Sequence, residues 1–149
     1  VTDQPIAARV RGRDGRLLSE VWGPSPQAYL GTTVPGFPNL FLLLGPNTVL
    51  GHTSVVYMIE AQLAYVLDAL RLMDARRVAS VEVRPPVVEA FNEDIQKKLQ
   101  GTVWNAGGCK SWYLDAAGRN SSLWPTYTFR FKNATKRFDP DAYILRPAD

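Results

Sequence analysis

The sequence predicts a mixed α/β fold in a single domain, with two principal helices, a small sheet and hairpins. A continuous apolar run, Leu40–Leu44, leads through a glycine-bounded loop into a long apolar helix over about residues 53–73. An alternating strand over residues 78–83 then precedes a second helix that opens at Pro85. With 46% hydrophobic and 21% charged residues, the composition is that of a folded globular chain.

The N-terminal part is expected to form a hairpin followed by an irregular loop. Residues 6–10 alternate apolar with polar or small side chains, Asp14-Gly15 supplies a turn, and residues 17–22 return as the second strand. Four prolines and two glycines then fall within residues 24–38, a density that no regular element tolerates. The expected anchors of this loop are Tyr29, Leu30 and Phe37.

The run Leu40–Leu44 has the composition of a strand buried on both faces, as in parallel sheets. Thr53 or Ser54 can cap the helix that follows, because a hydroxyl at this position accepts a hydrogen bond from an early backbone N–H. The polar residues of this helix fall on one narrow stripe, and the rest is apolar almost all round. Such a helix needs cover on more than one side, and we expect the chain to hold too little surface to supply it.

The second helix is predicted to run from Pro85-Pro86, where a missing N–H costs little, to a capping glycine at Gly101. Short strands are expected over residues 102–104, 110–114 and 120–124. A turn at residues 115–118 separates the last two strands. Residues 125–138 fit both the alternation of a strand and the spacing of a helix, and a proline at the first turn together with the longer span favours a helix.

Composition excludes several classes of function. A single cysteine, Cys109, rules out an intramolecular disulfide framework, and a single histidine, His52, rules out cages of two or three histidines around a metal. Neither a membrane span nor a secretory leader is visible in the sequence, so a cytoplasmic location is expected. The net charge of +3 lies within residues 101–149, which carry seven basic and four acidic side chains. This excess weakly favours a phosphate or carboxylate ligand and is too small to predict nucleic-acid binding.

The junction at residues 45–54 is the strongest local feature of the sequence. A buried strand feeds a loop bounded by Gly45 and Gly51, and the loop feeds a helix whose first turn has unpaired N–H groups. A helix start attracts anionic or electron-rich groups, and ligands of open α/β sheets bind where strands end. The candidate binding residues of this junction are Asn47, Thr48, Gly51, His52, Thr53 and Ser54. The alternative interpretation is that the loop merely caps a helix and that its glycines serve tight turns.

Other motifs fail or are weak. The phosphate-cradling loop requires a lysine where His52 stands and a shorter glycine spacing, and the dinucleotide fingerprint Gly-x-Gly-x-x-Gly is absent. A Ser54–His52 dyad has no obvious orienting acid, and Cys109 has no second histidine as its base. The last third mixes aromatic and basic residues, a combination that can bind single-stranded nucleic acid but more often forms an aromatic core with a basic rim.

Several runs of the sequence closely resemble one enzyme family. They are Tyr29-Leu30-Gly31, Gly36–Phe41, Gly45–Thr48, Gly51–Ser54, Trp104-Asn105, Cys109–Tyr113, Gly118–Asn120, Trp124-Pro125 and Phe138–Pro140. Together they resemble the C-terminal part of flavin-dependent monooxygenases of the Baeyer–Villiger and FMO-like type. The resemblance extends over nearly the whole chain, and the motifs occur in the order that the family has.

This resemblance implies FAD and NADPH as cofactors of the full-length enzyme. Family members form a flavin C4a-(hydro)peroxide with O2 and transfer one oxygen atom to a ketone or a heteroatom of a small organic substrate. It also implies that residues 40–44 complete the sheet of an FAD-binding Rossmann-like domain and that the junction at residues 45–54 faces the flavin. The substrate or nicotinamide side would take residues from the second half of the chain: Trp112, Tyr113, Arg119, Asn120 and Trp124.

Both glycine fingerprints and the Baeyer–Villiger signature lie upstream in the family. We therefore expect residues 1–149 to be a single C-terminal domain fragment that lacks the N-terminal FAD and NADPH domains. Such a fragment would be inactive alone, would bind FAD weakly or not at all, and would carry no catalytic residue. Exposed apolar surface would favour its self-association. The alternative is a stand-alone module whose aromatic and basic surface binds a small anion or single-stranded nucleic acid.

Overall fold

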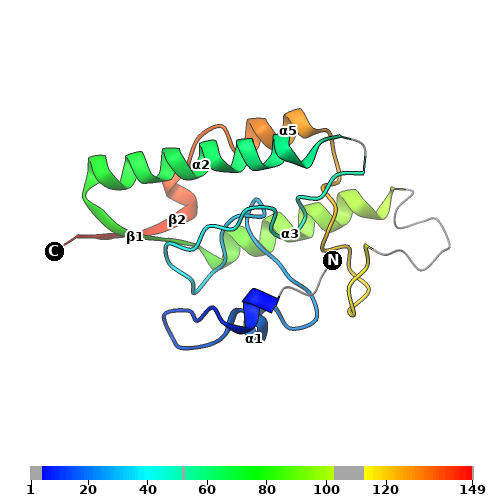
Figure 1. The fold of residues 1–149 in the computed structure, drawn as a ribbon, viewed down its shortest axis with the longest axis horizontal. Helices are drawn as coiled ribbons and strands as arrows, with labels where there is room; N and C mark the ends of the chain where they lie inside the picture. The colour runs from blue at the N-terminus through cyan, green and yellow to red at the C-terminus, as the bar shows by residue number, and fades with distance from the viewer. Residues whose placement is uncertain (1–4, 52, 103–112, 149) are drawn as a thin grey trace.

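The structure is a computed structural model that describes residues 5–51, 53–102 and 113–148. In Figure 1 the long helix α2 lies on one side of the molecule and the short N-terminal elements lie on the other. The elements in chain order are η1 (Pro5–Ala8), α1 (Leu18–Trp22), α2 (Val55–Arg76), β1 (Val78–Val83), α3 (Pro85–Gln100), α5 (Thr128–Ala134), η2 (Pro140–Ala142) and β2 (Tyr143–Pro147). The mixed fold with two principal helices and a small sheet is confirmed.

Both principal helices begin and end for identifiable reasons. Ser54 caps α2 by accepting a hydrogen bond from the N–H of Val56 at 3.3 Å, and Arg77 ends the helix in the left-handed conformation (φ 51°). α3 opens on its two prolines and ends at Gly101, as predicted. The sheet pairs β1 with β2 in antiparallel register, from Val83 opposite Tyr143 to Val78 opposite Pro147.

The main core lies between α2, the sheet and the loop around Leu30. The rings of Phe138 and Tyr143 pack with their centroids 4.2 Å apart, and Tyr65 packs against Phe138. The hydroxyls of Tyr65 and Tyr143 are hydrogen-bonded at 2.9 Å, and the hydroxyl of Tyr143 also meets Thr33 Oγ1 at 3.0 Å. Burial raises the pKa of Tyr143 to about 12, although both hydrogen bonds oppose the shift. These hydroxyls are therefore neutral members of the core.

The predicted N-terminal hairpin is wrong. η1 and α1 stand where two strands were expected, and an isolated bridge between Arg11 and Leu17 spans the turn at Gly15. Glu20 accepts a hydrogen bond from the N–H of Leu17 at 2.8 Å, which fixes a helical turn. Leu18 and Trp22, four residues apart, then bury the same face of α1. The apolar pattern was real, but its period was helical.

The expected strand at residues 40–44 is also not formed. The segment follows Asn39 (φ 59°) and ends on Leu44 (φ 52°), both of which are in the left-handed region, and Leu43 is exposed. The N–H of Leu42 donates to Thr32 O, and that of Leu44 donates to Gln62 Oε1. A loop and a glutamine side chain thus take the hydrogen bonds that a neighbouring strand would have taken.

In the C-terminal half, the turn at residues 115–118 is confirmed, with an isolated bridge between Leu114 and Asn120 beside it. The helix within residues 125–138 is confirmed as α5, although it is shorter than the span considered. The sequence reading missed β2, whose residues pair with β1 across a long separation in the chain. The strands expected at residues 103–104 and 110–112 lie outside the described residues.

Candidate functional site

The structure joins the loop at residues 45–50 to the segment at residues 120–124. The N–H of Asn47 donates to Ser121 O, that of Val49 donates to Ser122 O, and that of Trp124 donates to Val49 O, each at 2.9 Å. The pairing is parallel, with Val49 opposite Leu123. Part of the predicted cofactor side and part of the predicted substrate side therefore form one structural unit, although about 70 residues separate them in the sequence.

Asn47 holds this unit together from inside. Its side chain is buried, and its Nδ2 donates to the carbonyls of Asn120 at 2.7 Å and Leu123 at 2.9 Å. Its backbone is left-handed (φ 57°), a conformation that asparagine tolerates better than most residues. Thr48 is also buried, and its hydroxyl donates to Gly45 O at 2.6 Å. Both amide hydrogens of Asn47 are thus committed to the chain's own carbonyls.

The part of the junction that faces solvent is the start of α2. Gly51, Thr53 and Ser54 are exposed there, whereas His52 lies outside the described residues. The helix dipole places partial positive charge at this end, together with N–H groups that have no partner within the helix. Among the described residues, these three are the predicted cofactor-binding residues that are accessible.

A pocket of about 410 Å³ lies beside this helix start, and we call it the Trp124 pocket. Its lining residues are Gly51, Thr102, Leu123, Trp124, Pro125, Thr126, Tyr127 and Arg130. Gly51 from the predicted cofactor side and Trp124 from the predicted substrate side thus line the same space. Trp124 is fixed by a hydrogen bond from its Nε1 to Tyr127 O at 3.2 Å and by edge-on packing on Phe131. The Oγ1 of Thr126 is buried without a hydrogen-bond partner among the described residues.

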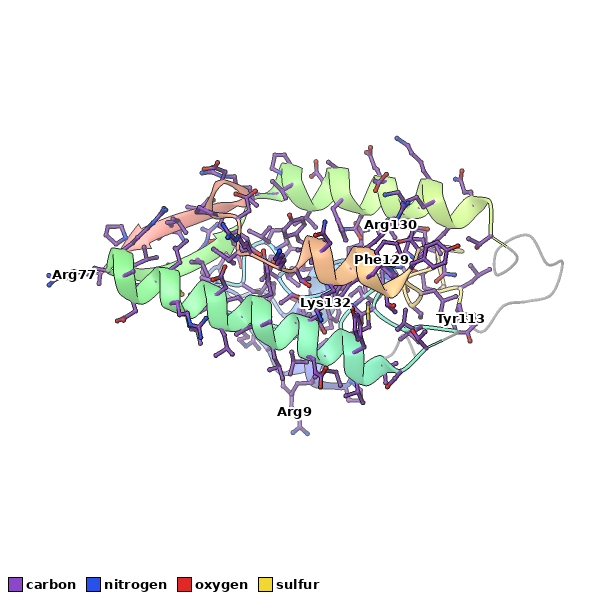
Figure 2. All side chains as sticks on the ribbon, turned by 90° about the horizontal axis from the view of Figure 1, so that it is seen from above. Arg9, Arg77, Tyr113, Phe129, Arg130 and Lys132 are labelled. Atoms are coloured by element: carbon purple, nitrogen blue, oxygen red, sulfur yellow. The ribbon has the colours of Figure 1, made fainter. Side chains whose placement is uncertain are left out.

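The other predicted substrate-side residues have different surroundings. Asn120 is buried, and its Oδ1 accepts hydrogen bonds from the N–H groups of Ser122 and Leu123. Tyr113 packs partly buried against the cluster around Leu123, and Arg119 is half-buried. Trp112 lies outside the described residues, as does Cys109. Figure 2 shows Tyr113 and Arg130 in the same half of the molecule.

Gln62 is a supporting residue that the sequence reading missed. It is fully buried on α2, where its Nε2 donates to Gly31 O at 3.0 Å and to Thr32 Oγ1 at 2.9 Å, while its Oε1 accepts from Leu44 N. It thereby ties the two loops that flank the site to the helix. A glutamine on the otherwise apolar face of a helix is the signal that could have revealed it.

Two further observations bound the chemistry of the described residues. They contain no group of three or more histidine, cysteine, aspartate or glutamate side chains that could hold a metal ion. Among these residues we find no helix with the length and apolar character needed to cross a bilayer. A larger groove of about 530 Å³ lies between α2 and α5, but none of the predicted site residues lines it.

The arrangement suits a flat ligand with an electron-rich edge. Trp124 and Tyr127 supply aromatic surface, Arg130 supplies a cation, and the start of α2 supplies N–H donors. These residues suit only one end of a large cofactor such as a dinucleotide. The described part of the chain has no glycine-rich turn that could hold the pyrophosphate, and it has no dinucleotide-binding βαβ unit.

Comparison with known proteins identifies relatives of the chain. A Baeyer–Villiger monooxygenase from Pseudomonas aeruginosa is 59% identical over 137 residues, which are 91% of this chain and 26% of that protein. A Baeyer–Villiger monooxygenase from Streptomyces coelicolor is 48% identical over 151 residues, which are 99% of this chain and 29% of that protein. The chain is related to one part of the Baeyer–Villiger monooxygenases.

Solved structures of this family share the fold. The structure of an oxidised steroid monooxygenase bound to NADP matches with a TM-score of 0.79 at 27% identity, over 92% of this chain and 26% of that one. The structure of cyclohexanone monooxygenase from Rhodococcus sp. Phi1 bound to NADP+ matches with a TM-score of 0.77 at 24% identity, over 93% and 27%. No protein-family model matches the chain. The chain thus spans about a quarter of the length of the Baeyer–Villiger monooxygenases it matches.

Proposed function

We propose that the chain is a C-terminal part of an FAD- and NADPH-dependent Baeyer–Villiger-type monooxygenase. The assembled enzyme would place one oxygen atom from O2 into a ketone or onto a heteroatom. The observation that carries the proposal is the union of the 45–50 loop with the 120–124 segment around the Trp124 pocket, in a chain 59% identical to a named member of that family. Both glycine fingerprints would come from the missing part of the enzyme.

Within that enzyme, the start of α2 would lie against the flavin of FAD. Gly51, Thr53 and Ser54 are exposed there and would contact the ring edge or the ribityl chain. Asn47 and Thr48 are buried behind them, and their hydrogen bonds would hold the loop in this conformation. The flavin supplies the redox chemistry when bound. The helix start would stabilise negative charge on its reduced ring, because preorganised donors act where charge develops.

The Trp124 pocket would form a wall of the substrate or nicotinamide side. Trp124 and Tyr127 would exclude water from the reacting centre, and Arg130 would attract an anionic group of the ligand. Tyr113, Arg119 and Asn120 would support this wall from behind. The cytoplasmic location and the self-association of the isolated chain stay predictions.

The alternative of a stand-alone nucleic-acid or anion module is less well supported. Phe131 is fully buried against Trp124, so part of the aromatic set is core. Tyr127 and Phe129 do stack in the open, with ring centroids 5.6 Å apart, beside exposed Arg130 and Lys132. The relatives that match almost the whole chain are nevertheless monooxygenases, and this does not favour a nucleic-acid module.

A chimera tests the proposal. The segment of the Pseudomonas aeruginosa monooxygenase that this chain matches is replaced by the chain, and NADPH- and O2-dependent oxygenation of a panel of ketones is measured. We expect FAD binding and oxygenation to be retained in the chimera, and Trp124→Ala to lower kcat/KM on its best ketone at least tenfold with FAD still bound. A folded chimera that binds no FAD would contradict the proposal.

A further inference from the structure

The groove between α2 and α5, which we call the α2–α5 groove, has the volume of a small-molecule site. It measures about 530 Å³, and such sites range over about 300–1,000 Å³. α2 contributes Tyr57, Glu60, Ala61 and Ala64, whose spacing puts them along one side of the helix. The opposite wall comes from α5 and the residues just after it. The groove shares no lining residue with the Trp124 pocket, so it is a second site on the same short helix.

The charges of the α2–α5 groove favour an anion. Lys132 and Lys136 line it from one side, and Glu60 is the single carboxylate among its lining residues. No ion pair of the described residues involves any of these three side chains. The Nζ of Lys132 lies 5.2 Å from the centre of the Tyr57 ring, and this cation–π contact keeps the ammonium at the groove. Figure 2 shows Lys132 on the side of α5 that faces α2.

The remaining surface of the groove favours a flat apolar body on that anion. Phe129 lines the groove with a side chain that is 61% exposed, and α2 presents only the small side chains of Ala61 and Ala64 there. An aromatic ring bound in the groove would cover Phe129, while a carboxylate on the ring would accept hydrogen bonds from the lysines. An inorganic anion would leave Phe129 in water, and a neutral hydrocarbon would leave both ammonium groups without an anion.

We infer that the α2–α5 groove binds a small aromatic carboxylate and that this ligand regulates the Trp124 pocket. The regulatory step rests on the proposed function. Its physical link is a pair of rings, since Phe129 lines the groove, Tyr127 lines the Trp124 pocket, and the two rings stack with their centroids 5.6 Å apart and their planes at 13°.

Both rings of this stack are mostly exposed, Tyr127 at 65% and Phe129 at 61%, so little of the described chain restricts their rotamers. A ligand that packs on Phe129 selects one position of that ring, and through the stack it selects one position of Tyr127 in the wall of the other pocket. The coupling is reciprocal, because a ligand in the Trp124 pocket must change the affinity of the groove by the same factor.

Titration of the isotope-labelled chain with 2-naphthoate, followed by amide NMR, tests the site. The alcohol 2-naphthalenemethanol has the same rings without the charge. Lys132→Gln with Lys136→Gln removes both ammonium groups of the groove, and Lys97→Gln is the matched control, because Lys97 is an exposed lysine on α3. Arg130→Gln removes the cation of the Trp124 pocket and so distinguishes the two sites.

We expect 2-naphthoate to bind with a dissociation constant of about 1 mM or below, an ordinary affinity for a ligand of this size. Its largest amide shifts should fall within residues 57–64 and 129–136. The alcohol, and the acid on the double glutamine variant, should bind at least about fivefold more weakly, whereas Lys97→Gln and Arg130→Gln should bind the acid within about twofold of the unmodified chain.

Three results would overturn the inference. The first is absence of binding, and the second is equal binding of the acid and the alcohol or of the acid to the double variant. The third is a set of shifts centred on Gly51 and Thr102 that disappears in Arg130→Gln, because the probe would then lie in the Trp124 pocket.

The regulatory step is measured in the FAD-loaded chimera. Saturating 2-naphthoate should change KM for the best ketone at least about twofold, and this change should be lost in Phe129→Ala and in the double glutamine variant. A change that persists in the double variant would overturn regulation through the groove, as would a chimera that no longer binds the probe or an active chimera that the probe leaves unchanged. A chimera that binds no FAD contradicts the proposed function and the regulatory step with it, whereas the NMR titration decides the groove by itself.

Discussion

At the scale of residues, Asn47 shows how a binding motif and a structural motif can share one side chain. The Gly-Pro-Asn-Thr run predicted an amide aimed at a cofactor, and the structure directs both amide hydrogens to carbonyls of the 120–123 segment. Asn47 is therefore a positioning residue for the loop. Sequence alone could not reveal this, because the partners of its side chain lie more than 70 residues away.

Replacing Asn47 with alanine is expected to destabilise the chain by about 2–4 kcal/mol. Two hydrogen bonds are lost, and the left-handed conformation that Asn47 adopts costs alanine more conformational free energy than asparagine. The carbonyl of Asn120 keeps a hydrogen bond from Gln96, which limits the loss. Urea unfolding checks the value, with exposed Asn133→Ala as the control, expected within about 0.5 kcal/mol of the unmodified chain. Equal stability of both variants would contradict the positioning role.

The lowered pKa of the buried Glu82 determines how the stability of the fold changes with pH. Burial alone would raise its pKa, but hydrogen bonds from Arg13, Arg146 and the N–H of Gly36 outweigh burial and hold the pKa below its usual range. A lowered pKa in the folded state means that Glu82 stabilises the fold fully above the ordinary glutamate pKa, and that this stabilisation is lost as the pH falls through the folded-state pKa.

We therefore expect Glu82→Gln to unfold more easily at pH 7, by about 1–3 kcal/mol, since both arginines remain partly in water. The difference from the unmodified chain should shrink as the pH falls below about 4. Unfolding midpoints in urea between pH 3 and pH 7 measure this, and exposed Glu93→Gln serves as the matched control. A difference that stays constant with pH would show that folding does not lower the pKa of Glu82.

At the scale of elements, the sequence predicted best where local signals are strong. The two principal helices, their serine and glycine caps, the strand at residues 78–83 and the turn at residues 115–118 are confirmed. The failures are elements whose conformation depends on distant partners. The run at residues 40–44 is apolar enough for a buried strand, but no strand of the described chain pairs with it, and β2 was missed because β1 alone defines its place.

The packing of the loop at Gly31 against the 45–50 loop gives a prediction at this scale. A Cβ on Gly31 would lie 2.1 Å from Thr48 Cγ2 and 2.8 Å from Pro46 O, and the residue has φ +60°. Gly31→Ala should therefore destabilise the fold by more than about 3 kcal/mol and disturb the 45–50 loop. Gly15→Ala has a positive φ but open space around its Cβ, so it isolates the conformational term at about 1 kcal/mol. Thermal unfolding of the two variants distinguishes steric clash from backbone strain, and equal losses would contradict the close packing.

At the scale of the whole molecule, the candidate site was predictable in part. The sequence placed ligand chemistry at the helix start and around Trp124, and the structure brings Gly51 and Trp124 into one pocket. Thr126, Tyr127 and Arg130 line the same pocket and were not predicted as site residues, because no local motif marks them. The exposed apolar side chains of α2, among them Val56, Leu63 and Leu67, agree with the expectation that this helix needs more cover than the chain supplies.

Titration of FAD, followed by quenching of its fluorescence, tests the central claim that the chain completes a flavin site and does not form one. The chain alone should give no sub-micromolar binding, whereas the chimera that carries it should bind FAD tightly. Tight binding of FAD by these 149 residues alone would contradict the account.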